Sequence, residues 1–232
     1  MTTKSKQNNR TSIWEKVCVT DPKYTKPGTG TGNKFTAINP TWLVKKATEV
    51  FGPAGEGWGT KIHSHEVIEG PVLDNNGTRG TVYVVLLSLW WKGEDGAKFE
   101  TPAQFGQTHM VVKRKSGQIV MDDEAPKKAV TDAMNKCFSY LGFSADIFMG
   151  LWDDNKYVES AAATYAAEAM KKLPEMVEGY SRQLEQCATT SQVRALWHLT
   201  SELRNTYPNE PLILGLAAAI TKKGKLIDVP NK

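Results

Sequence analysis

Residues 60–115 constrain the fold most, because they combine strand-like alternation with turn signals at short intervals. Lys61–Glu69 alternates polar and apolar side chains, Asn76-Gly77 is a strong hairpin signal, and Thr81–Trp91 is a long run of residues that favour β-strands. Residues 98–100 can begin a further strand after a glycine turn. The pattern predicts an antiparallel meander of three or four strands.

Two well-delimited helices flank this region. Asn39 suits a helix N-cap, Pro40 suits the first helical position, and Gly52-Pro53 ends the helix. A second helix is expected to begin near Asp122–Glu124, whose carboxylates suit the positive end of the helix dipole, and to end at Gly142. Helices and an antiparallel sheet together predict the α+β class.

The C-terminal third of the chain has a different composition. Residues 159–220 are alanine-rich and helical in pattern, with breaks expected at Pro174, around Thr189–Ser191 and at Pro208–Pro211. Near the other end, Ile13–Thr20 alternates apolar and polar residues. The chain is therefore expected to have three parts: a flexible tail (1–12), a core (13–157) and a helical C-terminal region with a basic tail (158–232).

Charge and cysteine usage narrow the class of protein. The first fifty residues hold nine Lys or Arg against three Asp or Glu, a balance that is compatible with phosphate binding but also with a solvated tail. The three cysteines, Cys18, Cys137 and Cys187, are far apart and odd in number, which favours a reducing cytoplasm over a disulfide framework. No apolar run is long enough to span a bilayer, so no membrane partner is expected.

A glycine-rich basic segment, Lys23–Lys34, precedes the first helix. A nucleotide-binding loop needs Gly-Lys followed by Ser or Thr, whereas Gly32 is followed by Asn33, so the motif fails. Two interpretations remain open for this segment: a flexible loop along a nucleic-acid backbone, or a plain connector.

Possible catalytic or metal-binding groups are each better explained by structural roles. His63 and His65 are predicted to lie on one face of a strand, where metal binding is less expected than an ordinary surface or core position. Asp122–Glu124 is interpreted as a helix start rather than a nuclease carboxylate cluster. Trp90 and Trp91 should face opposite sides of the sheet. No catalytic residue, metal or cofactor is therefore assigned.

Two stretches resemble the Rad fifty-two family of single-strand annealing proteins and its phage relatives. Asn39–Trp58 is similar to the family's helix ending in Phe-Gly, followed by a glycine turn that closes on a tryptophan. Ala129–Gly142 is similar to its Ala-Val-Thr-Asp helix, which ends at an aromatic-rich glycine turn. The resemblance covers residues 13–157 and implies an antiparallel β-β-β-α core of the single-strand annealing type, assembled side by side into rings or filaments.

The resemblance also implies DNA-contacting residues. The family presents two adjacent basic residues after the aspartate of the second helix, and here these positions are Asn135 and Lys136, so one charge is replaced by an amide. A further basic position of the family is Ser139 here. The implied contacts to the DNA backbone are Lys26, Lys34, Lys127 and Lys136, then Lys23 and Lys128, with Asn135 at the substituted position. Thr131 and Asp132 are expected to serve helix structure or subunit contact.

The resemblance implies a non-enzymatic protein that binds single-stranded DNA without sequence preference and anneals complementary strands in recombination and repair. It needs neither ATP nor metal, forms a homo-oligomer, and acts in the cytoplasm of a bacterial host. Two alternatives stay open. One is a metal-dependent nuclease using His63, His65 and Asp122–Glu124. The other is an adaptor whose C-terminal region docks a replication or recombination partner, such as a single-stranded-DNA-binding protein or an exonuclease.

Overall fold

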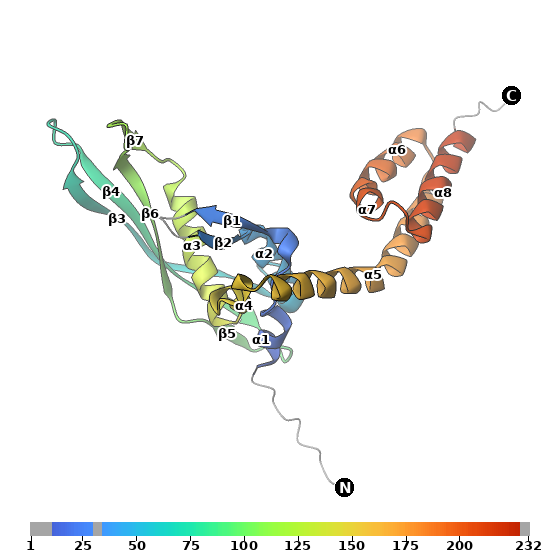
Figure 1. Ribbon diagram of the computed structural model, residues 1–232, viewed down its shortest axis with the longest axis horizontal. Coiled ribbons are helices and arrows are strands. Elements are labelled where there is room, and N and C mark those ends of the chain that lie inside the picture. Colours follow the sequence, from blue (N-terminus) through green and yellow to red (C-terminus); the bar gives the residue numbers. More distant parts are fainter. Residues whose placement is uncertain (1–10, 30–33, 228–232) are drawn as a thin grey trace, which may run out of the picture. The chain divides into compact units, whose positions relative to one another are not determined.

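The computed structural model describes residues 11–29 and 34–227 and has the α+β class expected from the sequence (Figure 1). The chain divides into two compact units, the first ending at Ala162 and the second beginning at Ala163. The elements are α1 (Ser12–Val17), η1 (Pro22–Tyr24), β1 (Thr25–Thr29), β2 (Lys34–Ile38), α2 (Pro40–Phe51), β3 (Trp58–Val72), β4 (Arg79–Lys92), β5 (Lys98–Glu100), β6 (Gln104–Lys113), β7 (Ile119–Met121), α3 (Ala125–Tyr140), α4 (Ala145–Phe148), η2 (Leu151–Asp153), α5 (Asn155–Gln186), α6 (Thr190–Leu199), α7 (Ser201–Thr206) and α8 (Pro211–Ile227).

The first helix of the core, α2, forms where its capping residues predict it. The Asn39 side chain accepts a hydrogen bond from the Thr41 N–H, and Pro40 occupies the first turn. The helix ends at Gly52, which has a φ of 92°, a conformation that favours glycine. Residues 13–17 of the alternating stretch near the start of the chain lie in the short helix α1.

The main sheet is a five-stranded antiparallel sheet in the order β3-β4-β6-β7, with β5 paired to β4 (Figure 1). The β3–β4 hairpin turns at Asn76-Gly77 as predicted, and Gly77 has a φ of 84°. Residues 98–100 form the predicted further strand, β5. The short strand β7 was not predicted from the sequence, because three residues are too few to show a pattern.

Helix α3 covers one face of the sheet, where it packs against β4 and β6. The two backbones approach closely at Gly106, since a Cβ there would overlap the backbone of Ala129 and Ala133. Phe138 and Leu87 are fully buried in this layer. Burying a side chain of this size stabilises a fold by about 1.5–3 kcal/mol. The packing of α3 on the sheet is therefore the main hydrophobic core of the first unit.

A buried carboxylate joins the start of the chain to α4 and α5. Asp146, which is 1% exposed, accepts hydrogen bonds from the N–H (2.8 Å) and Oγ1 (2.6 Å) of Thr20, 126 residues away. It also accepts from Trp152 Nε1 at 2.8 Å and from the Tyr157 hydroxyl at 3.2 Å. Burial, and then the charge and hydrogen bond of Asp146, raise the pKa of Tyr157 to about 12.

The second unit contains the C-terminal part of α5 and helices α6 to α8. Its cores are formed by two groups of buried apolar residues: Leu184, Val193, Leu196, Leu216 and Ile220, and Leu173, Leu203 and Ile213. The helix breaks near residues 189 and 208–211 occur as predicted, but the break at Pro174 does not, since α5 continues through it to Gln186. None of the helices among the described residues has the length and apolarity of a membrane span.

Candidate nucleic-acid interface

The described part of the basic glycine-rich segment supplies strand β1 and the first residue of β2, which form a two-stranded hairpin, instead of the expected loop. Strands β1 and β2 pair antiparallel, with Lys26 opposite Ala37 and Gly28 opposite Phe35. Lys26 is exposed on this ribbon. Residues 30–33 and the side chain of Lys34 lie outside the described part of the structure, so the predicted contact of Lys34 can be placed only by its backbone in β2.

Two lysines from different elements approach the aromatic ring at the base of the hairpin. The Nζ of Lys23 lies 5.9 Å from the centroid of Tyr24, and the Nζ of Lys45, from α2, lies 5.5 Å from it. The Asn39 N–H donates to the Tyr24 carbonyl at 2.9 Å and ties the hairpin to the start of α2. Lys23 and Lys45 thus lie at one ring, and together with the nearby strand residue Lys26 they are hereafter called the hairpin lysines. Lys45 was not among the sequence-predicted contacts, although its outward position on α2 was readable from the helical pattern.

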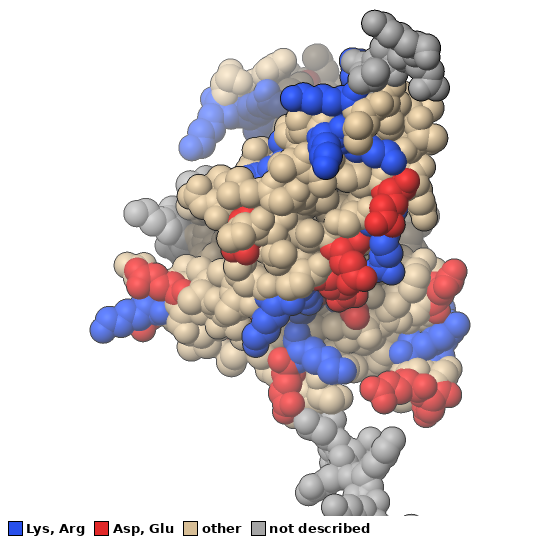
Figure 2. All heavy atoms as spheres, turned by 90° about the vertical axis from the view of Figure 1, so that its right-hand side faces the viewer, with Lys and Arg blue, Asp and Glu red and all other residues tan. Residues whose placement is uncertain are grey.

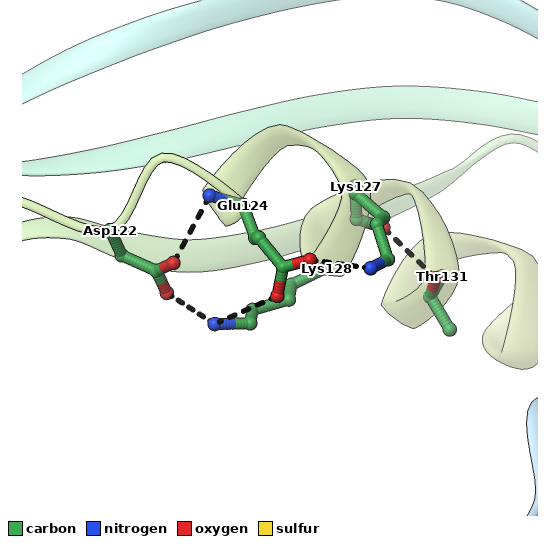
Figure 3. Close-up of polar contacts among 5 residues, drawn as sticks. All are labelled: Asp122, Glu124, Lys127, Lys128 and Thr131. Atoms are coloured by element: carbon green, nitrogen blue, oxygen red, sulfur yellow. Dashed lines mark hydrogen bonds and ion pairs between the residues drawn. The ribbon is translucent and has the colours of Figure 1, made fainter.

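The lysines at the start of α3 are bound by neighbouring carboxylates (Figure 3). Lys127 Nζ lies 2.6 Å from Glu124 Oε1, and Lys128 Nζ lies 2.6 Å from Asp122 Oδ2. The hydrogen bond from Lys127 lowers the pKa of Glu124, and the hydrogen bond from Lys128 lowers that of Asp122. The same bond to Asp122 raises the pKa of Lys128. The carboxylates expected at the helix start therefore also compensate the two lysines predicted to contact phosphates.

Further along α3, Lys136 and Asp132 form hydrogen bonds with backbone groups of β6 at the edge of the sheet. Lys136 Nζ donates to the Phe105 carbonyl at 2.9 Å and lies 2.9 Å from Asp132 Oδ2. Asp132 Oδ2 accepts from the Gln107 N–H at 3.2 Å. These backbone groups belong to a part of β6 that β7 does not reach, since β7 pairs only with residues 111–113. The pair thus satisfies edge groups that would otherwise be open to strand addition.

The surroundings of Asn135 and Thr131 on α3 do not by themselves indicate that either side chain contacts a phosphate. The Asn135 Oδ1 atom is buried and accepts no hydrogen bond from the described residues. The Thr131 hydroxyl donates to the Lys127 carbonyl at 2.9 Å within the helix (Figure 3), a helix-internal role as expected. DNA contact by Asn135, Lys127, Lys128 and Lys136 stays a prediction, and for the three lysines it requires phosphates to compete with existing ion pairs.

Figure 2 shows a face of the molecule on which Lys and Arg side chains lie interspersed with Asp and Glu. This agrees with the modest net charge of +4.

The two histidines of β3 lie on opposite faces of the sheet, so their predicted common face is wrong. The β3–β4 register shifts by one residue between Ile62 and Ser64, and this bulge reverses the alternation. His63 Nε2 lies 2.8 Å from Ser88 Oγ, whereas His65 stacks on Tyr83 with ring centroids 5.9 Å apart. Ser88 and Tyr83 differ by an odd number along β4, which places them on opposite faces.

The group around His63 is a polar cluster without the geometry of a catalytic triad. Ser88 Oγ donates to Glu100 Oε1, and this hydrogen bond lowers the pKa of Glu100, with Lys61 and His63 adding to the effect. Because the Ser88 proton is directed to Glu100, His63 is not placed to remove it. No group of three or more metal-ligating side chains occurs in residues 11–29 and 34–227.

Trp90 and Trp91 point to opposite sides of the sheet, as their positions predict. Trp91 packs against Phe51 of α2 and stacks on Phe99, with centroid distances of 6.0 and 5.6 Å. On the other face, Trp90 covers Gly59 and has Lys98 Nζ 4.3 Å from its centroid. Trp91 thus belongs to the helix-covered side and Trp90 to the opposite face.

Comparisons with known proteins add no relative. No protein-family model matches the chain, and no curated protein is significantly similar to it.

Proposed function

We propose that the protein binds single-stranded DNA without sequence preference and anneals complementary strands as a homo-oligomer, without ATP. The observation that carries the proposal is the order of elements around the two family-like stretches. Helix α2 ends at Gly52, the chain closes on buried Trp58, strands β3, β4 and β6 pair antiparallel, and α3 packs on them. This order supports the proposal, because the sequence resemblance implies an antiparallel β-β-β-α core.

The hairpin lysines supply the chemistry that the proposal needs. Lysine side chains that neutralise phosphates release counterions, which gives affinity without base recognition. Lys23 and Lys45 come from different elements and meet at one ring, so their charges are held together by the fold and not only by sequence proximity. Once a strand is held extended, pairing with its complement drives the reaction, since each stacking step contributes about 1.4 kcal/mol.

An open sheet edge supports self-association. Among residues 11–29 and 34–227, β4 is the one strand that pairs with β3, and residues 60–69 of β3 are exposed in succession. Ile62, Val67 and Ile68 are 47–54% exposed on this edge. Long edge strands with exposed apolar side chains favour pairing with another chain. Side-by-side assembly through this edge is the form of oligomer that we propose.

The experiment is the annealing of two complementary dye-labelled oligonucleotides, with EDTA present and without ATP. We expect acceleration by the wild-type protein, and a reduced rate for the double variant Lys26→Ala/Lys45→Ala. Lys171→Ala/Lys172→Ala, which removes two exposed lysines of the second unit, is the matched control and should anneal at the wild-type rate. No acceleration together with no gel shift of single-stranded DNA would refute the proposal.

A further inference from the structure

One face of the β1–β2 hairpin combines a lysine, a glycine and an exposed aromatic ring. Gly28 is the cross-strand partner of Phe35, and Lys26 is the partner of Ala37. Because side chains alternate along a strand and directly opposed residues share a face, these four residues lie on the same face of the ribbon. Lys26 and Phe35 are diagonal neighbours there, at a typical separation of about 7–8 Å between Cα atoms.

The Phe35 ring is supported on one side and open on the other. It packs directly on Gly28, since a Cβ at that position would overlap ring carbons Cε2 and Cζ. Nevertheless, 53% of Phe35 remains exposed. A ring that is held against the backbone loses little further freedom when a second flat group stacks on its open side.

We propose that Phe35 is a stacking platform for a base of the bound single strand, while Lys26 on the same face contacts the adjoining phosphate. The inference rests on the proposed function and adds to it a contact to the base. Aromatic stacking suits a protein without sequence preference, because every base presents a π-face. Alternating aromatic and basic side chains are the usual means of binding single-stranded nucleic acid.

A purely structural role for Phe35 is the competing explanation. An aromatic side chain that covers a glycine on a neighbouring strand stabilises β-structure by itself. Such a role needs an apolar cover but not an aromatic one. Leucine at position 35 would preserve much of this cover while removing the π-face, and tyrosine would preserve both.

The test compares two oligonucleotides of equal length, oligo-dT and an abasic oligomer with the same phosphates. We expect Phe35→Leu to weaken binding of oligo-dT by about 5- to 100-fold and to leave the abasic oligomer within about twofold of wild type. Phe35→Tyr should restore the affinity for oligo-dT. Phe148→Ala, at a phenylalanine of α4 that is 64% exposed, is the matched control and should change neither affinity.

The outcomes separate this inference from the proposed function. If wild type binds both oligomers but Phe35→Leu weakens them equally, or not at all, the stacking inference is wrong and the proposed function stands. If Phe35→Leu changes the mass of the DNA-free protein in light scattering, Phe35 belongs to a subunit contact and the inference is overturned. If wild type binds neither oligomer, the proposed function itself fails.

Discussion

Replacing Asp146 with alanine should cause a large loss of stability in the first unit. The substitution removes the acceptor of the N–H and Oγ1 of Thr20, which is 0% exposed in the folded protein. Each buried donor that loses its partner costs about 1–3 kcal/mol. The expected loss in the free energy of unfolding is therefore on the order of 2–6 kcal/mol, a large part of the about 5–15 kcal/mol available to a domain.

Urea denaturation followed by tryptophan fluorescence measures this loss. Six of the seven tryptophans lie in the first unit, so the signal reports mainly on the unit that contains Asp146. Asp123→Ala removes an exposed carboxylate and is the control, with an expected change within about 0.5 kcal/mol. If Asp146→Ala unfolds within about 0.5 kcal/mol of that control, the carboxylate does not hold Thr20 as described.

Three further predictions concern DNA binding, assembly and pH. Lys26→Ala should reduce the slope of log affinity for single-stranded DNA against log salt concentration by about 0.7. Lys136→Ala should reduce it by less, because Asp132 already compensates the charge of Lys136. An equal or larger change for Lys136→Ala would contradict the assignment of Lys26 as the stronger phosphate contact. Val67→Lys, on the open edge of β3, should lower the mass of the assembly measured by light scattering, and an unchanged mass would exclude this edge from the interface. The contribution of Tyr157 to the free energy of unfolding should be fully present below about pH 10 and be lost as pH rises towards 12. Unfolded tyrosine loses its proton near pH 10, whereas Tyr157 in the folded protein keeps its proton to about pH 12. Tyr157→Phe should flatten this part of the pH profile of unfolding, and an identical profile would exclude Tyr157 as its cause.

Elements with local signals were predictable from the sequence. Asn39, Pro40 and Gly52 delimit α2 through contacts within a few residues, and Asn76-Gly77 fixes the β3–β4 turn in the same way. The hairpin was missed because Pro27 and the glycines around it obscure a strand pattern. Pro174 was expected to break a helix, yet Leu173 and Val177 beside it pack into the cores of the second unit. Tertiary packing can offset the local cost of a helical proline.

The candidate site was less predictable, because its geometry depends on single residues and distant contacts. One extra residue at His63 reverses the alternation of β3, and nothing in the composition of the strand marks the bulge. Besides its ion pair with Asp132, Lys136 donates to the backbone carbonyl of Phe105, which is 31 residues away. The hydrogen bonds between Thr20 and Asp146 span 126 residues. The spacing of Glu124 and Lys127, and of Asp132 and Lys136, could indicate ion pairs on a helix, but not the contacts of the second pair with the backbone of β6.

The long edge strand β3 constrains the symmetry of any assembly built by extending the main sheet. The β3 edge has fifteen residues and the β7 edge has three. If β3 pairs with β3 of another copy, the two partners are related by a twofold axis and association through this edge stops at two copies. If β3 binds a different surface of the next copy, a pair of copies still has one unused β3 edge and one unused surface of the other kind. Further copies can then add until a ring closes or a filament grows. An assembly of three or more copies joined by one type of contact would therefore require β3 to pair with a surface other than itself.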